Sequence, residues 1–171
     1  MNNVDVSDLL SECREELISI KALLTGIGDG ARPAPYVRKY AVIRAAGSIE
    51  TGFKQIIADR VDRDSHTQLR NFIARKIRNS SCNPRLEMIR SMLTEFDESW
   101  RARFDEKMAL ADQPVLSGAL TELVKARNSF AHGGAGELPI DKTIECFDHG
   151  CTVLSILDET VHEDAEGEDQ D

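Results

Sequence analysis

One short segment of the chain combines an arginine and a histidine, five residues apart. It reads Arg127-Asn128-Ser129-Phe130-Ala131-His132-Gly133-Gly134. A guanidinium can hold a phosphate through two parallel hydrogen bonds, and an imidazole can move a proton near neutral pH. RNA carries its own nucleophile, the 2′-hydroxyl, so these two groups are the minimum needed to cut RNA without a metal ion.

Three residues of this segment and one acid from earlier in the chain would have roles in such a reaction. His132 would take the proton of the 2′-hydroxyl, and a second His132 from another copy would protonate the leaving 5′ oxygen. Arg127 would hold the phosphate and stabilise the charge that builds in the transition state. Asn128 would orient the imidazole or the ribose, and Glu50 would pair with Arg127 and aim it. The expected products are a 2′,3′-cyclic phosphate and a 5′-hydroxyl.

A helix over residues 117–132, ended by the glycines, would position the pair. On it, Arg127 continues an apolar stripe, where a guanidinium needs a partner or a ligand. His132 would lie about 140° round from Arg127 and roughly 7.5 Å further along the axis. The two side chains would meet on one phosphate only if they bend toward each other, or if a second copy of the chain brings its own pair. The stripe is Leu116, Leu120, Leu123, Val124, Arg127 and Ala131.

Structural roles for the same residues remain open. Arg127 would equally serve as an ion-pair partner of Glu50 or Glu122. His132 would be favoured at a helix C-terminus by the helix dipole alone. Asn128 and Ser129 would then only help to end the helix.

The whole chain predicts an all-α, up-and-down bundle of about five to six helices, because apolar residues recur at spacings of three and four and no period-two run of any length occurs. The third helix should turn Leu69, Phe72, Ile73 and Ile77 inward. In the second, longest helix, Ile43 belongs to the apolar set. The expected helices cover residues 5–24, 35–61, 65–78, 85–96, 117–132 and 139–161, and residues 100–111 are helical but heavily charged.

The net charge of −9 is unevenly distributed. Residues 158–171 hold eight acidic side chains and no basic one, which leaves 22 acidic against 21 basic in the remainder. We expect a helical domain over residues 1–161 and a disordered acidic tail over residues 162–171. Residues 60–90 hold eight basic and three acidic side chains, which form either a solvated helical face or a surface that follows phosphates. The candidate RNA-binding residues there are Arg70, Arg75, Lys76 and Arg78.

Several functional classes receive no support from the sequence. No window approaches 18 consecutive apolar residues, and residues 1–8 lack a basic start and an apolar run, so a cytoplasmic protein is expected. The four cysteines are expected to be free, partly buried thiols. Cys146, His149 and Cys151 do not predict a zinc site, because the two thiols would point about 140° apart on a helix. No metal or cofactor is expected, and His149 and His162 should lie at the surface.

The segment ending at Gly134 resembles the R-x4–6-H signature of the HEPN superfamily, with four intervening residues and a polar Asn128 after Arg127. An earlier segment, Ala45-Ala46-Gly47-Ser48-Ile49-Glu50-Thr51-Gly52-Phe53, is similar to the helix that precedes the motif in RiboL-PSP-type HEPN proteins. The order of elements, helix number and length are also similar, so the resemblance covers most of residues 1–160.

This resemblance implies a helical bundle that dimerises and places two motifs in one cleft. Active members are metal-independent endoribonucleases of toxin–antitoxin, abortive-infection and related anti-phage defence systems. Arg127 and His132 match the two signature positions, Asn128 the adjacent polar position and Glu50 the acid of the preceding helix. The expected partners are RNA, a second copy of the chain, and a cognate antitoxin or defence protein.

Two other interpretations remain. In the first, the chain is a catalytically silent HEPN-like module that binds a protein or a nucleotide; the near-neutral body and acidic tail favour it. In the second, the motif occurs by chance in a structural helical protein, and Arg127 and His132 face no common cleft even in an oligomer.

Overall fold

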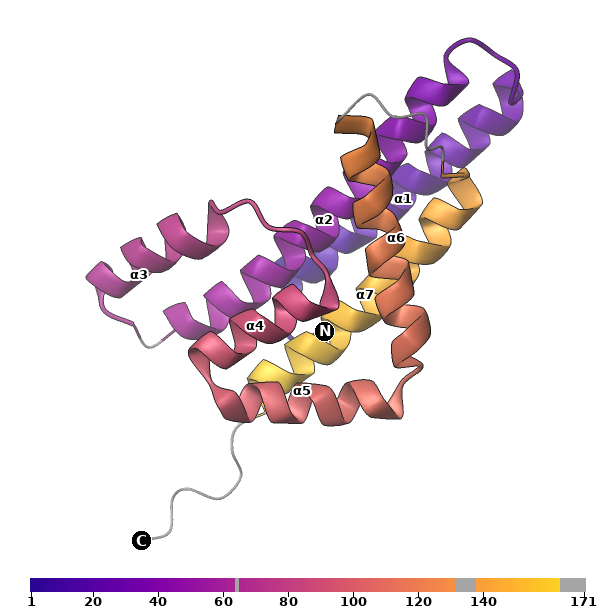
Figure 1. Ribbon diagram of the computed structural model, residues 1–171. Coiled ribbons are helices and arrows are strands. Elements are labelled where there is room, and N and C mark those ends of the chain that lie inside the picture. The colour runs from indigo at the N-terminus through magenta and orange to yellow at the C-terminus, as the bar shows by residue number, and fades with distance from the viewer. Residues whose placement is uncertain (64, 132–137, 164–171) are drawn as a thin grey trace, which may run out of the picture.

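The computed structural model describes residues 1–63, 65–131 and 138–163, and these form seven α-helices and no strand (Figure 1). The all-α prediction is therefore confirmed. The charged segment that was expected to be helical over residues 100–111 forms a full helix, which brings the number of helices to seven instead of about five to six. It starts where the Asp97 carboxylate accepts a hydrogen bond from the Ser99 amide (2.7 Å). The helices are α1 (Val4–Ile27), α2 (Ala34–Asp62), α3 (Thr67–Ile73), α4 (Leu86–Phe96), α5 (Glu98–Leu110), α6 (Gln113–Ala131) and α7 (Ile140–His162).

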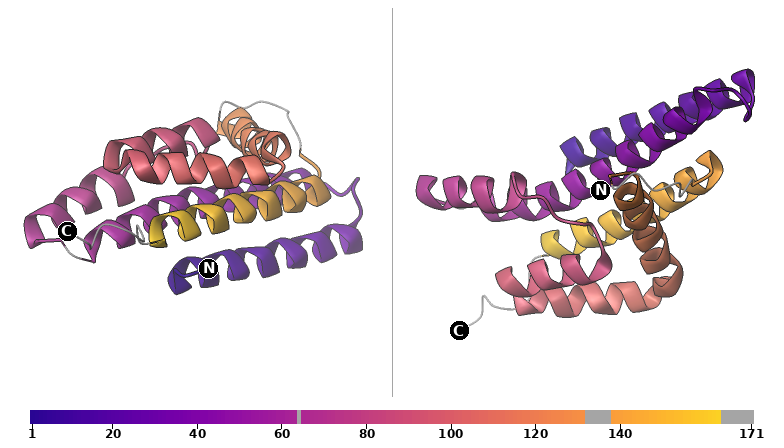
Figure 2. Two further views of the ribbon diagram at one scale, coloured as in Figure 1. Left: turned by 90° about the horizontal axis from the view of Figure 1, so that it is seen from below. Right: turned by 45° about the horizontal axis from the view of Figure 1, so that its top comes forward.

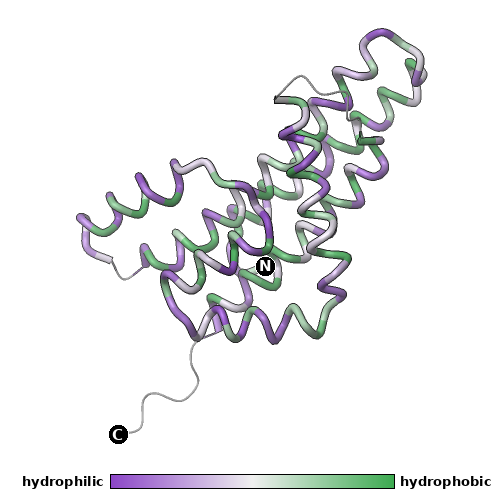
Figure 3. The backbone as a smooth tube through the Cα atoms, in the orientation of Figure 1, coloured by the Kyte–Doolittle hydropathy of each residue, from purple (hydrophilic) through white to green (hydrophobic). Residues whose placement is uncertain are grey.

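The helices pack in three layers around α7 (Figure 2). In the left view, α1 lies below, α2 and α7 lie in the middle, and α4, α5 and α6 lie above. Hydrophobic and hydrophilic residues alternate along the long helices (Figure 3), as expected for helices packed on one side. None of the helices in the described ranges is both long and apolar enough to cross a bilayer.

Two glycines let the central helices approach closely. A Cβ atom on Gly52 of α2 would lie 2.8 Å from Cδ1 of Leu154 in α7. A Cβ atom on Gly150 of α7 would lie 2.8 Å from Cδ1 of Ile49 in α2. Both distances are below normal contact, so these positions fix the spacing at which the helix bearing Glu50 packs on α7.

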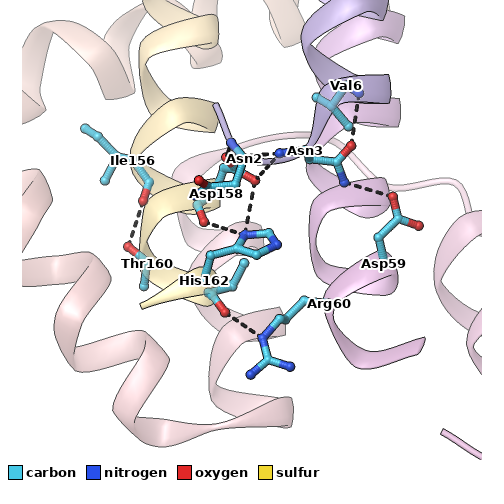
Figure 4. A network of polar contacts seen from close by, with 10 residues as sticks. Asn2, Asn3, Val6, Asp59, Arg60, Ile156, Asp158, Thr160 and His162 are labelled. Carbon is cyan, nitrogen blue, oxygen red and sulfur yellow. Dashed lines mark hydrogen bonds and ion pairs between the residues drawn. The ribbon is translucent and has the colours of Figure 1, made fainter. Parts of the chain in front are cut away.

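A buried carboxylate joins the start of α1 to the end of α7 (Figure 4). Asp158 is fully buried and accepts hydrogen bonds from the backbone amides of Asn2 and Asn3 (3.2 Å for Asn3). The Asn3 side chain donates to Asp59 of α2 (2.8 Å). His162, expected at the surface, has only 10 % of its side chain exposed, and its Nδ1 lies 2.8 Å from the carbonyl of Asp158. The acidic stretch over residues 158–171 thus begins with a carboxylate, Asp158, that is part of the folded core.

Three apolar residues expected inside are exposed. Leu69 and Phe72 of α3 are 45 % and 56 % exposed, whereas Ile73 and Ile77 are buried as predicted. Among the described elements, the helix packs against α2 on one side, and no other helix covers its outer side. After Ile73 it continues as a π-helix, η1 (Ala74–Arg78). Ile43 of α2 is 50 % exposed because none of the described helices covers its side chain. The motif histidine and the tail from residue 164 onward lie outside the described residues.

Candidate functional site

Arg127 lies on the last described turn of α6 and connects three parts of the chain. Its Nη1 donates to Glu50 Oε2 of α2 at 2.7 Å, and its Nη2 donates to Asn83 Oδ1 at 2.5 Å. The expected ion-pair partner Glu50 is confirmed, and Glu122 contacts Lys142 of α7 instead (3.9 Å). With 23 % of its side chain exposed, Arg127 is held at the edge of the core rather than inside it.

Glu50 is the centre of this cluster. Its second oxygen, Oε1, accepts hydrogen bonds from Lys54 Nζ and from the Cys82 backbone amide, both at 3.1 Å. Its side chain is 12 % exposed. Burial alone would raise the pKa of Glu50, but the hydrogen bonds from the Cys82 amide, Arg127 and Lys54 together outweigh it and lower the pKa. Glu50 is therefore ionised at neutral pH.

Sequence reasoning missed two members of the cluster, Lys54 and Asn83. Lys54 has 10 % of its side chain exposed, and its Nζ donates to the Ser80 carbonyl at 2.6 Å as well as to Glu50. The i, i+4 spacing of Glu50 and Lys54 on one helix was a usable signal. Asn83 fell in an expected break at residues 79–84, and no periodicity there indicates where a side chain points.

The segment between η1 and α4, residues 79–85, is consequently held against α2 and α6 at three points. These are the Ser80 carbonyl on Lys54, the Cys82 amide on Glu50 and the Asn83 side chain on Arg127. We call residues 79–85 the connecting segment. It fixes the direction of the guanidinium, which still keeps N–H groups that no contact with the described residues uses and that can donate to an anion.

The other motif residues are placed only in part. Asn128 is half-buried and follows Arg127 on α6, so it points to a different side of that helix. Phe130 is half-buried, and the ammonium of Lys39 on α2 lies 5.6 Å from the centre of its ring. His132 lies outside the described residues, so its pairing with Arg127 stays a prediction.

The candidate RNA-binding residues divide into two groups. Arg70, Arg75 and Lys76 are exposed on α3 and η1. Arg78 is bound by two carboxylates of α2, Asp59 (2.7 Å) and Asp62. The first group is open to a ligand, whereas the charge of Arg78 is largely neutralised within the fold.

The cysteines are free, as predicted. Burial and the nearby Glu122 raise the pKa of Cys146 to about 12, and burial and Asp148 raise the pKa of Cys151 to about 12. Both are therefore thiols rather than thiolates at neutral pH. Within the described ranges, no group of three or more His, Cys, Asp or Glu side chains is arranged to hold a metal ion.

Comparison with protein families gives one match: the RiboL-PSP-HEPN family matches residues 8–163. Comparisons with curated proteins and with solved structures give no significant match. The match spans all seven helices except the first residues of α1, and it includes the helix that carries Glu50 and the helix that carries Arg127. The predicted family is thereby confirmed, while the R-x4-H motif stays a prediction; the chain belongs to the RiboL-PSP-HEPN family, whose members are generally ribonucleases.

Proposed function

We propose that the protein is a metal-independent endoribonuclease that cuts RNA by attack of the 2′-hydroxyl, with Arg127 and His132 contributed by two protomers. The observation that carries the proposal is the position of Arg127. It stands on the helix that leads to His132, and Glu50 and Asn83 orient it from two other segments.

The charge of the cluster suits a phosphate. At neutral pH, Glu50 contributes one negative charge, and Lys54 and Arg127 contribute one positive charge each. The cluster thus keeps a surplus positive charge at the edge of the core, where solvent screens it less than at an open surface. A guanidinium already oriented by two acceptors loses little side-chain freedom when it binds a phosphate.

His132 would serve as general base in one protomer and general acid in the other. A helix continued past Ala131 would place His132 roughly 7.5 Å along the axis from Arg127 and about 140° round it. On such a helix, the two side chains of one chain would diverge. A second copy, turned to face the first, would bring its imidazole to the other side of the same scissile phosphate.

The exposed side of α2 supports a site for this second copy. Tyr36, Tyr40 and Ile43 are 73 %, 49 % and 50 % exposed, at positions i, i+4 and i+7. Tyr36 and Ile43 lie within about 40° of Glu50 around the helix, and Tyr40 lies about 80° from it, so a dimer formed there would place the two clusters on the side of α2 that faces the partner. Ile43→Asp is expected to make the protein monomeric in light scattering coupled to size exclusion, and to reduce cleavage without unfolding the chain. The proposed setting is a toxin–antitoxin or anti-phage defence system.

A second candidate function is a catalytically silent HEPN module that binds a protein or nucleotide partner. The contacts of Arg127 favour it to some degree, because a guanidinium that binds both Glu50 and Asn83 also serves to hold the connecting segment.

Cleavage of RNA in the presence of EDTA tests the proposal. Wild-type protein is compared with Arg127→Ala, His132→Ala and Lys125→Ala, and the ends of the products are mapped. Lys125 is the matched control, because it is exposed on the same helix two residues before Arg127. We expect cyclic-phosphate ends from wild type and Lys125→Ala, and no cleavage by the other two. Loss of activity counts only if circular dichroism and oligomeric state are unchanged.

Two results would contradict the proposal. The first is wild-type protein that cuts neither single-stranded nor double-stranded RNA nor tRNA. The second is cleavage that persists in folded Arg127→Ala and His132→Ala protein, since it would come from another site or a contaminant. The first result favours the silent module.

A further inference from the structure

α3 and η1 together form an arm that projects from the side of the bundle (Figures 1 and 2). It is anchored to α2 by two buried residues, Ile73 and Ile77, and by the ion pairs of Arg78. Its remaining surface faces solvent. We call residues 67–78 the arm.

The exposed side of the arm combines an aromatic ring with cations. Phe72 is 56 % exposed, and Arg75 and Lys76 follow it by three and four residues, which places them on the same side of the helix one turn further on. The half-exposed Leu69 lies beside Phe72, whereas Arg70, two residues before Phe72, is exposed on another side of α3. Within the part of the chain that the structure describes, none of these cations has a carboxylate within ion-pair distance.

Other arginines of the same basic stretch have acidic partners. Arg78 binds Asp59 and Asp62, and Arg90 binds Asp105 at 2.7 Å. These pairs hold the arm to α2 and α4 to α5. The cations on the outer side of the arm make no ion pair with the described residues, so their positive charge is available to a ligand.

The arm leads directly to Arg127. The connecting segment starts where η1 ends, and its Asn83 accepts the hydrogen bond from Arg127 three residues after the Ser80 carbonyl accepts one from Lys54. A chain of phosphates that runs along the arm toward the bundle would thus reach the guanidinium next.

We propose that the arm binds a single-stranded stretch of RNA beside the phosphate that is cut. Arg75 and Lys76 would contact backbone phosphates, and one base would stack on Phe72. The proposal rests on the ribonuclease function for its biological meaning, but not for its test. Cations beside an exposed ring match a polyanion with stackable bases better than an apolar protein surface.

Binding of a fluorescent single-stranded 2′-O-methyl RNA, measured by anisotropy at several salt concentrations, tests the arm. This probe lacks the 2′ nucleophile and cannot be cut. Arg75→Gln/Lys76→Gln should reduce the slope of log affinity against log salt by about 1.4, because each lost phosphate contact on a single strand accounts for roughly 0.7. Phe72→Ala should weaken binding roughly 5- to 100-fold with little change in slope.

The matched control removes two cations at the opposite end of the bundle. Lys21 and Arg32 are exposed near the turn between α1 and α2, and Lys21→Gln/Arg32→Gln carries the same change of net charge. It should bind as wild type does. Because Phe72, Arg75 and Lys76 are exposed, the arm variants should also unfold at the wild-type temperature.

The outcomes separate the arm from the ribonuclease proposal. The proposal that the arm binds RNA would be overturned if the arm variants bind RNA as the wild type does, or if the wild-type protein binds no RNA. The proposal is likewise overturned if the arm variants keep RNA binding but lose binding of a poly-glutamate peptide. The arm would then be a site for an acidic protein partner. If the wild type binds through the arm but cuts nothing, the ribonuclease proposal fails and the arm stands. If the wild type is a nuclease, cleavage of a dinucleotide too short to reach the arm should be unchanged in the arm variants.

Discussion

Replacing Glu50 with glutamine is expected to lower the free energy of unfolding by about 2 kcal/mol. Glutamine keeps the shape and one oxygen that can accept from the Cys82 amide and Lys54. It removes the charge that faces Arg127 and offers an NH2 group in place of Oε2. Breaking a fully buried pair costs about 3–5 kcal/mol. We expect about 2 kcal/mol rather than about 3–5 kcal/mol because the side chains of Glu50 and Arg127 are 12 % and 23 % exposed and so are not fully buried.

Urea unfolding followed by the fluorescence of Trp100 measures this cost. The control is Glu145→Gln, which breaks a pair with Lys142 of similar length (2.7 Å) at an exposed surface, with side chains 53 % and 39 % exposed. This control should cost no more than about 0.5 kcal/mol. Equal slopes of free energy against urea in all three proteins would show that only stability has changed.

The pH dependence gives an independent check on Glu50. Because its pKa in the folded protein is lowered from the ordinary 4.5, the stability that its charge contributes is fully present above that value. The contribution is lost as the pH falls through the lower, folded pKa. The difference in the free energy of unfolding between wild type and Glu50→Gln should therefore disappear in acid. A variant no less stable than Glu145→Gln, or a gap that persists in strong acid, would refute the role given to Glu50.

Three further predictions concern the fold. Asp158→Ala should lower the free energy of unfolding by about 3 kcal/mol in urea, because it leaves the N-terminal amides without their buried acceptor; a loss below 1 kcal/mol would contradict this. Gly52→Ala should cost roughly 1–3 kcal/mol through the contact at 2.8 Å, whereas Gly118→Ala, whose Cβ would meet nothing within 4 Å, should gain roughly 0.5–1 kcal/mol; calorimetry decides the signs. Cys146 and Cys151, with pKa values raised to about 12, should resist iodoacetamide in native protein and react in urea, as mass spectrometry would report.

The pattern of apolar residues predicted the helices because burial on one side of a helix imposes spacings of three and four. The same reasoning predicted a partner for Arg127, since a guanidinium that continues an apolar stripe needs one, and Glu50 was the acid on the preceding long helix. It failed at Leu69 and Phe72. A helical wheel tells which residues share a side, but not whether another helix covers that side.

The contacts outside the helices could not be predicted in this way. Asn83 and Ser80 act from an irregular segment whose path has no periodicity in the sequence. Asp158 was counted with the acidic residues after it, because sequence charge does not distinguish a carboxylate that binds backbone amides from one in water. The pairing of Arg127 with His132 stays a prediction from the motif and the family.

The central place of α7 has a consequence for the order in which the protein forms during synthesis. α1 and α2 leave the ribosome first and can pair with each other, with Val6 of α1 against Gly52, but the contact of Gly52 with Leu154 forms only when α7 has been made. That helix ends about a hundred residues after α2, roughly 5–20 s later at ordinary rates of translation. The nascent chain therefore holds an open apolar surface for that time and is a natural client for chaperones. All residues of the cluster around Arg127 are synthesised before α7. The core is complete only after α7 has been made, so the packing that stabilises the fold forms after the residues of the site are in place.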